Sequence, residues 1–150
     1  MEKLLKRLND AGARYVVIGG QAMRQHGMPR FTLDWDIFVP PLDQDTFDRI
    51  NAALENILDM KLEKLDVGTG AGFVQTFQTD AGIIQFHLSP PGLPKFSLVE
   101  ARSITCDYHG IPVKYLNLDD LLSSKQASAR DKDSDDILFL TIKKQSQGNS

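Results

Sequence analysis

Cysteine is almost missing from this sequence of 150 residues, in which Cys106 is the single example. One thiol cannot form a disulfide within a chain, which excludes the small secreted scaffolds that disulfides stabilise. Long apolar runs are missing too: residues 15–18 form an apolar run far shorter than a bilayer requires. Residues 1–10 carry charges throughout and lack the apolar core of a signal peptide. We therefore expect a cytoplasmic protein without a membrane partner.

Charge of one sign is not in large excess either, since the formal net charge is only −3 at pH 7. A small negative charge gives no overall field that would attract nucleic acid. Apolar residues make up 41% and charged residues 25% of the chain, as in ordinary soluble globular proteins. A chain of this length can bury a sizeable core. We expect one domain over residues 1–144 and a disordered polar tail over residues 145–150.

The periodicity of the apolar residues predicts a mixed order of helices and strands. Helices are expected around residues 4–11 and over residues 21–26, 45–58, 118–129 and 134–143. Strands are expected over residues 14–18, 35–39, 73–79, 83–88, 104–108 and 111–115. Residues 89–95 are rich in proline and glycine and should form an irregular loop. This order predicts an α+β fold, with helices packed on a mixed sheet and a helical pair at the C-terminus.

Two aspartates, Asp34 and Asp36, form the chemical centre of the sequence. Side chains alternate across a strand, so these carboxylates should point to one face while Trp35 and Ile37 bury on the other. Two like charges this close repel each other, and a bound cation offsets the repulsion. Mg²⁺ suits such a pair because it binds one or two carboxylates together with phosphate oxygens and water. Taken alone, the pattern is also that of a polar face on an edge strand.

Two glycines, Gly19 and Gly20, stand where a buried strand gives way to a helix. Glycine lets a ligand approach the backbone closely, and the first N–H groups of a helix bind anions. A triphosphate could bind there, although a tight turn would need the same residues for geometry alone. Arg30 could bind a phosphate through two hydrogen bonds, or neutralise Asp34 at the surface. Thr32 could hold an aspartate or a phosphate oxygen.

Together these motifs resemble the DNA polymerase β-type nucleotidyltransferase superfamily. Its members place a Gly-Gly or Gly-Ser turn after an apolar strand, then a short helix and an Asp-x-Asp motif. Here residues 21–33 separate the glycine pair from the aspartate motif. The wider pattern is most similar to small prokaryotic members related to abortive-infection toxins. The resemblance covers about residues 13–140 and ends in a motif made of Lys125, Arg130, Lys132, Asp133 and Asp136.

Members of that superfamily transfer a nucleoside monophosphate from a nucleoside triphosphate to a hydroxyl and release pyrophosphate. The resemblance implies that Asp34 and Asp36 bind Mg²⁺ or Mn²⁺ and that Gly19 and Gly20 lie beside the phosphates. It also implies that Lys125 reaches the phosphates or the mouth of the site. The acceptor could be a protein, an RNA end or a small molecule. A partner protein or a second copy of the chain could supply the acceptor surface.

One residue departs from the superfamily pattern, in which a later strand carries a third carboxylate. Gln85 occupies that position here, where it could offer a carbonyl oxygen to the metal but cannot act as a general base. Asp80, at the preceding turn, is expected to lie too far away. His87 shares the strand face of Gln85 and could be a base, a ligand or a plain polar residue. The alternative function is therefore a catalytically weak module that binds a nucleotide or a partner.

Two other enzyme classes use an Asp-x-Asp motif with a metal ion. In phosphatases of the haloacid-dehalogenase type the motif directly follows a buried apolar strand, whereas residues 29–32 precede it here. Glycosyltransferases normally need a nucleotide-sugar domain larger than 150 residues can provide. Both classes fit the sequence less well than the nucleotidyltransferases do.

Overall fold

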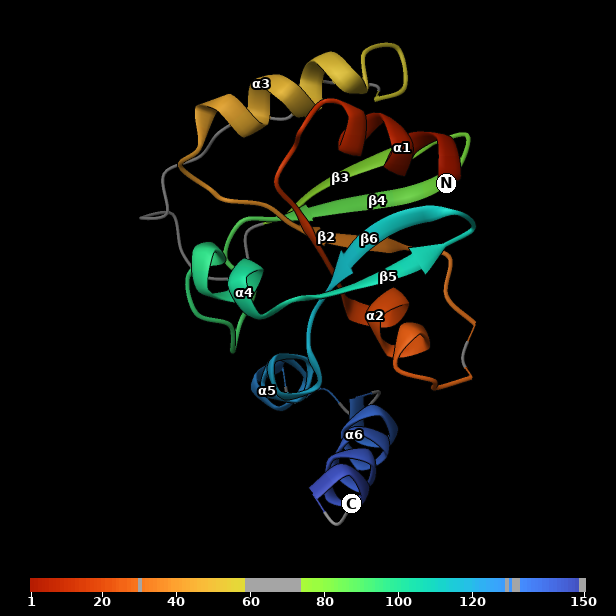
Figure 1. Cartoon of the computed structure of the whole chain (residues 1–150), viewed down its shortest axis with the longest axis vertical. Coiled ribbons are helices and arrows are strands. Elements are labelled where there is room, and N and C mark those ends of the chain that lie inside the picture. The colour runs from red at the N-terminus through yellow and green to blue at the C-terminus, as the bar shows by residue number, and fades with distance from the viewer. Residues whose placement is uncertain (30, 59–73, 129, 131–132, 149–150) are drawn as a thin grey trace.

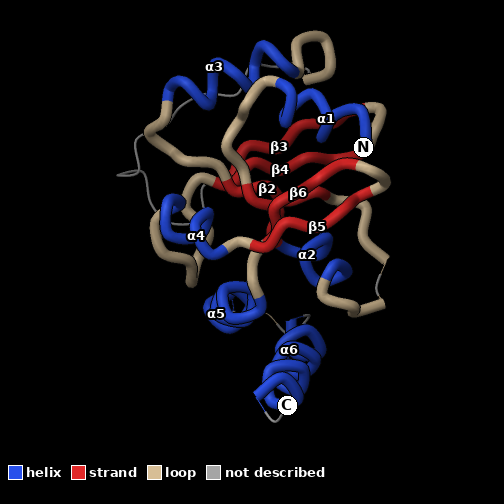
Figure 2. The backbone as a smooth tube through the Cα atoms, in the orientation of Figure 1, coloured by secondary structure: helices blue, strands red, loops and turns tan. Residues whose placement is uncertain are grey.

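The computed structural model describes residues 1–29, 31–58, 74–128, 130 and 133–148. Its centre is a sheet of six strands in the order β3-β4-β2-β1-β6-β5. The strands are β1 (Val16–Ile18), β2 (Trp35–Phe38), β3 (Val74–Thr79), β4 (Gly82–His87), β5 (Ile104–Tyr108) and β6 (Ile111–Tyr115). Figure 2 shows this sheet in the middle of the molecule, with helices above and below it.

The helices form a layer on each side of the sheet. They are α1 (Glu2–Asp10), α2 (Gly19–Gln25), α3 (Gln44–Ala53), α4 (Phe96–Arg102), α5 (Leu118–Ser128) and α6 (Ser134–Gly148). Helices α1 and α3 lie on one face, while α2, α4 and the C-terminal pair α5 and α6 lie on the other (Figure 1). No helix in the described ranges has the length and apolar character needed to span a membrane. The predicted α+β fold, with its mixed sheet and C-terminal helical pair, is confirmed.

Strand β2 is an interior strand, and its neighbours run in opposite directions. It pairs antiparallel with β1 and parallel with β4, where Asp36 lies beside Gln85. Strand β1 continues the sheet by a parallel pairing of Val17 with Tyr115 in β6. The antiparallel hairpins β3–β4 and β5–β6 occupy the two edges. The Asp-x-Asp motif therefore does not lie on the polar face of an edge strand.

The alternation of side chains along β2 follows the prediction. Trp35 and Ile37 are buried, with 4% and 0% of their surface exposed. The Trp35 ring packs edge-on against Tyr108, with ring centroids 5.0 Å apart. Phe38, on the opposite face, packs edge-on against an aromatic ring of α4. Burying a side chain such as Ile37 contributes roughly 1.5–3 kcal/mol, so this packing holds Asp36 on the face that carries α2 and α4.

Helices α4 and α3 differ from the sequence expectation, the first in its presence and the second in its length. Helix α4 is not predicted from the sequence; it has seven residues and directly follows the proline- and glycine-rich residues 89–95. It nevertheless buries Phe96 and Val99, which lie three residues apart on one face. Helix α3 ends at Ala53, five residues before the predicted end, and the chain then turns at Asn56, which has a φ of 67°. A positive φ is incompatible with a continuing right-handed helix.

The C-terminal helix is longer than its apolar pattern indicates. Helix α6 continues to Gly148, so residues 145–148, expected as part of a disordered tail, are helical. Glutamine and serine are compatible with a helix, and residues 134–147 contain no proline or glycine that would interrupt one. The apolar period marks only the part of a helix that packs on its neighbour. Residues 149–150 lie outside the described part of the chain.

Buried charges join α5 to α6. Lys125 Nζ lies 3.0 Å from Asp136 Oδ2 and 3.4 Å from Asp133 Oδ1. Asp133 also accepts hydrogen bonds from Ser128 Oγ at 2.8 Å and Arg130 Nε at 3.0 Å. Burial alone would raise the pKa of Asp133, but these hydrogen bonds and the two cations outweigh it and lower the pKa to about 2. Asp133 is therefore an ionised anchor between the two helices.

Replacing Asp133 with asparagine should lower the free energy of unfolding at pH 7 by on the order of 2 kcal/mol, because Arg130 and Lys125 each lose one anionic partner. A carboxyl whose pKa is lowered by folding stabilises the native state above its ordinary pKa of 3.8. That stabilisation disappears as the pH falls through the folded-state pKa of about 2. The difference between wild type and Asp133→Asn should therefore shrink from pH 4 downward in urea titrations.

The matched control is Asp135→Asn, because Asp135 is an exposed aspartate two residues away, in the first turn of α6. Its free energy of unfolding should stay within about 0.5 kcal/mol of wild type at every pH. A difference for Asp133→Asn that is as large at pH 2 as at pH 7 would show that the carboxylate charge is not what stabilises the pair.

Candidate functional site

The site begins where β1 passes directly into α2. The buried residues of β1 end at Ile18, and α2 starts at Gly19 with no side chain capping its first turn. Gly19 has a φ of 66°, a left-handed conformation that glycine adopts without strain. The expected glycine turn is thus the first turn of the helix, two residues before its predicted start at Gln21.

Both glycines lie against the segment that carries the aspartates. A methyl carbon added to Gly19 would lie 2.6 Å from Asp36 Oδ2, and one added to Gly20 would lie 2.9 Å from Thr32 Oγ1. Each distance is shorter than a carbon can approach without moving its neighbour. The glycines are therefore needed for the close approach of α2 to Asp36 and Thr32, in addition to the geometry of the turn.

The segment before β2 is attached to α2 through the carbonyl oxygen of Asp34. Gln21 Nε2 and Thr32 Oγ1 both donate to this oxygen, each at 3.4 Å. Phe31 and Leu33 are 84% and 66% exposed, while Thr32 and Asp34 between and beside them are half-buried. This alternation places Asp34 on the same side as Thr32 and Asp36. Sequence reasoning missed Gln21, because nothing local indicates that a glutamine here would be buried.

Asp36 is hydrogen-bonded to a residue of the neighbouring strand. His87 Nε2 in β4 lies 2.8 Å from Asp36 Oδ1, and the two side chains are 17% and 19% exposed. An ionised carboxylate can only accept a hydrogen bond, so Nε2 carries the hydrogen and donates it. The sequence left the role of His87 open, and the structure gives it this direct contact with the aspartate motif.

Gln85 is the strand neighbour of Asp36. The parallel pairing of β2 and β4 sets Gln85 beside Asp36, on the same face of the sheet. Ile84 and Phe86, on either side of it, are completely buried on the opposite face. The neighbour of Asp36 is therefore an amide in place of a carboxylate.

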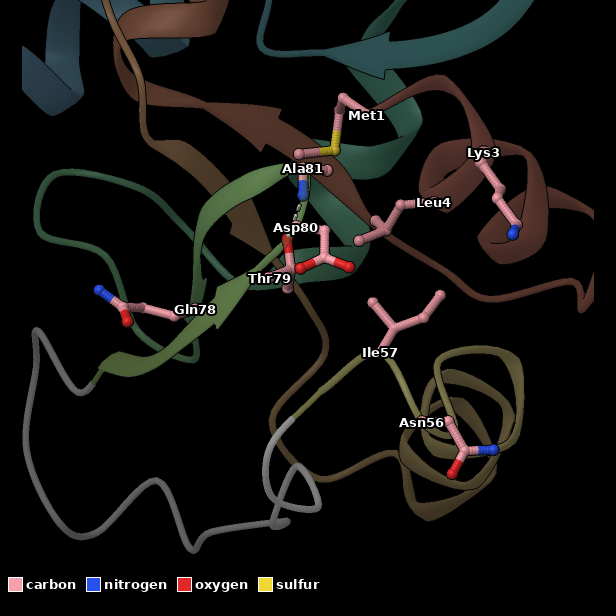
Figure 3. Close-up of a pocket in the computed structure, with 9 residues that line it drawn as sticks. All are labelled: Met1, Lys3, Leu4, Asn56, Ile57, Gln78, Thr79, Asp80 and Ala81. Carbon is pink, nitrogen blue, oxygen red and sulfur yellow. Dashed lines mark hydrogen bonds between the residues drawn. The ribbon is translucent and has the colours of Figure 1, made fainter.

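Asp80 belongs to a different part of the surface. It lines a cavity of about 530 Å³ between α1, the end of α3 and the β3–β4 turn, together with Leu4 and Ile57 (Figure 3). Neither Asp34 nor Asp36 is among the described residues that line this cavity. That Asp80 lies too far from the aspartates to replace the third carboxylate stays a prediction.

Two other predicted site residues remain, Arg30 and Lys125. Arg30 lies outside the described residues. Lys125 is 7% exposed in α5, and its ammonium group lies between Asp133 and Asp136 of the C-terminal pair. These two carboxylates neutralise the lysine, so its observed role is structural, in place of the predicted contact with phosphates.

The donors at the site fit a metal ion that arrives with phosphate oxygens. No group of three histidine, cysteine, aspartate or glutamate side chains within the described ranges could hold a metal ion. Asp34 and Asp36 offer two carboxylates, and Gln85 offers an amide oxygen beside Asp36. Mg²⁺ is usually bound by one or two carboxylates together with substrate phosphates and water. The residues therefore suit Mg²⁺ or Mn²⁺ shared with a triphosphate better than a metal held by protein alone.

Comparisons with known proteins identify the fold. No protein-family model and no curated protein matches the chain. A candidate nucleotidyltransferase from Thermotoga maritima matches over 95% of this chain and 90% of its own, with a TM-score of 0.67 and 13% sequence identity. The structure of JHP933 from Helicobacter pylori matches 93% of this chain, with a TM-score of 0.51 and 20% identity. The match covers 63% of JHP933, less than two thirds of that protein.

At these identities the likeness shows a shared fold. The match to the Thermotoga protein extends over nearly the whole of both chains. It confirms the nucleotidyltransferase-type fold that the aspartate and glycine motifs predict.

Gly19→Ala should destabilise the fold more than Gly110→Ala. Both glycines have a positive φ, 66° and 89°, at which alanine costs roughly 1–2 kcal/mol. An added methyl at Gly110 meets no atom within 4 Å, so only Gly19 should show a further loss from the contact with Asp36. Chemical denaturation measures both losses. The excess at Gly19 should shrink in an Asp36→Ala background, and an undiminished excess would contradict the contact.

Proposed function

We propose that this chain is a metal-dependent nucleotidyltransferase, which transfers a nucleoside monophosphate from a nucleoside triphosphate to a hydroxyl acceptor. The observation that carries the proposal is the contact of the Gly19–Gly20 turn with Asp36 and Thr32. The fold shared with the Thermotoga protein supports it. The motifs add a resemblance to small prokaryotic members related to abortive-infection toxins. An acceptor surface from a partner protein or a second copy of the chain belongs to the same proposal.

In this proposal, Asp34 and Asp36 hold Mg²⁺ or Mn²⁺ together with the triphosphate. The ion, when bound, neutralises phosphate charge and orients the phosphates. Gly19 and Gly20 let the backbone of the turn lie close to Asp36 and Thr32, so that phosphates bound with the ion would lie beside this turn. The Thr32 hydroxyl, beside Gly20, is placed to donate to a phosphate oxygen or to orient Asp34.

The transfer step makes a bond between the acceptor oxygen and the α-phosphorus while the bond to pyrophosphate breaks. The hydroxyl proton must pass to a base or to water. Gln85 cannot accept it, because an amide is not basic at neutral pH. We therefore expect nucleotide binding with slow transfer. A module that binds nucleotide without turnover is the second candidate, and Gln85 is the observation that favours it.

A nucleoside triphosphate with Mg²⁺ should raise the thermal midpoint of the wild-type protein. Ligand at about a hundred times its dissociation constant stabilises the fold by roughly 2.7 kcal/mol, which corresponds to roughly 5–10 °C for a chain of this size. Asp36→Asn should lose most of this rise, since a metal ligand becomes neutral. Differential scanning fluorimetry with each of the four triphosphates, with and without Mg²⁺ or Mn²⁺, measures it.

Asp48→Asn is the control, because Asp48 is an exposed carboxylate of α3 on the opposite face of the sheet. It should respond to the metal nucleotide as wild type does. Equal responses of Asp36→Asn and wild type would remove Asp36 from the metal site.

Gln85→Asp should bring the site closer to three carboxylates. We expect tighter binding of Mg²⁺ or Mn²⁺ and faster release of pyrophosphate, because a third negative charge attracts the cation. The same charge should lower the stability of the metal-free protein by repelling Asp34 and Asp36. Metal titration and a pyrophosphate assay on both forms test the two effects.

Gln85→Asn is the matched control, because it shortens the side chain as Gln85→Asp does but adds no charge. It should neither tighten metal binding nor speed turnover. Robust wild-type turnover that falls in Gln85→Asp would show that Gln85 does not stand at a vacated acid position.

A further inference from the structure

Asp36 is held from two sides by parts of the chain that are far apart in sequence. Its Oδ1 accepts a hydrogen bond from His87 in β4, and its Oδ2 lies against Gly19 at the start of α2. We infer that His87 is a positioning residue, which fixes the Asp36 carboxylate so that Oδ2 is presented beside the Gly19–Gly20 turn. The inference rests on the proposed metal site and names the residue that prepares it.

His87 is well anchored for this role. Its carbonyl oxygen accepts a hydrogen bond from Val39 N at 3.1 Å, immediately after β2. Its Cα is paired with Phe38, two residues from Asp36 on the same strand. Both the backbone and the ring of His87 are therefore tied to the strand that carries the aspartate. A short, 17% exposed side chain on such a backbone has little freedom to leave Asp36.

Orientation matters here because a carboxylate rotates easily. The terminal torsion of aspartate is broad, so a free carboxylate presents its oxygens in many directions. The hydrogen bond at Oδ1 and the close backbone at Oδ2 restrict this rotation before a cation binds. Outer partners of metal ligands typically change metal affinity by roughly 10- to 100-fold. The effect is important in this site, because Gln85 adds no charge to attract the cation.

The same hydrogen bond distinguishes a positioning role for the Nε2 atom of His87 from the roles of metal ligand and base. The Nε2 atom donates its hydrogen to Asp36, so this nitrogen has no lone pair for a metal ion or for an acceptor proton. Through Nε2, the nitrogen that contacts the aspartate motif, His87 acts by way of Asp36.

The test uses three substitutions that differ in reach and in hydrogen-bonding ability. His87→Gln places an amide nitrogen the same number of bonds from Cα as Nε2 of histidine. His87→Asn carries the same amide one bond closer to the backbone, and His87→Phe keeps a ring without a donor. Binding of Mn²⁺ with a non-hydrolysable nucleoside triphosphate is followed by electron paramagnetic resonance of free Mn²⁺. Thermal midpoints without ligand show whether each variant is folded.

We expect His87→Phe and His87→Asn to weaken Mn²⁺ binding roughly 10- to 100-fold. His87→Gln should recover most of that affinity, which a purely space-filling role of the imidazole would not allow. The comparison of glutamine with asparagine holds even if the phenylalanine variant does not fold, because the two amides differ by one methylene group.

Wild-type affinity in all three variants would overturn the positioning role and leave the proposed function standing. Equal losses in all three, glutamine included, would also overturn it, because the imidazole would then act other than by donating to Asp36. If the wild-type protein binds no Mn²⁺ with nucleotide, the proposed function fails and the inference fails with it.

Discussion

The burial of Trp35 and Ile37 determines which way β2 faces, and the arrangement of the site depends on that orientation. Because side chains alternate along a strand, a slip of one residue would place Asp36 in the core and Ile37 among the polar groups. Neighbouring strands on both sides hold the register through backbone pairing. The position of Asp36 next to Gly19, Gln85 and His87 is therefore a consequence of core packing.

Helix α2 connects this site to the C-terminal part of the chain. Its first residues contact Asp36 and Thr32. Its last turn is held from the other side, because His26 Nε2 donates to Leu116 O at 2.8 Å and Lys143 of α6 donates to His26 O. Burial lowers the pKa of His26, which favours the neutral ring in this position. The C-terminal pair thus supports the end of α2 that lies away from the aspartates.

Local patterns predicted the parts of the site that lie close together in sequence. The alternation that buries Trp35 and Ile37 and turns Asp36 to the other face needs only a few neighbouring residues, and so does the glycine pair between β1 and α2. The strand face of Gln85 also followed from alternation. The contact between His87 and Asp36 joins residues 51 positions apart and depends on the register of two strands, which a single sequence does not specify. Lys125 was placed on the right helix, but its direction depends on how α6 packs, so its pairing with Asp133 and Asp136 could not be foreseen.

Trp35 gives this architecture an optical property. It is the single tryptophan of the chain, and peptide bonds join it directly to Asp34 and Asp36. Its indole lies 4% exposed behind the site, edge-on to Tyr108. The indole emission of the protein therefore comes from one place, the face of β2 opposite Asp36. A movement of that strand changes the surroundings of this intrinsic fluorophore, so no added label is needed. Unfolding exposes the same indole to water, so Trp35 emission also differs between the folded and unfolded chain.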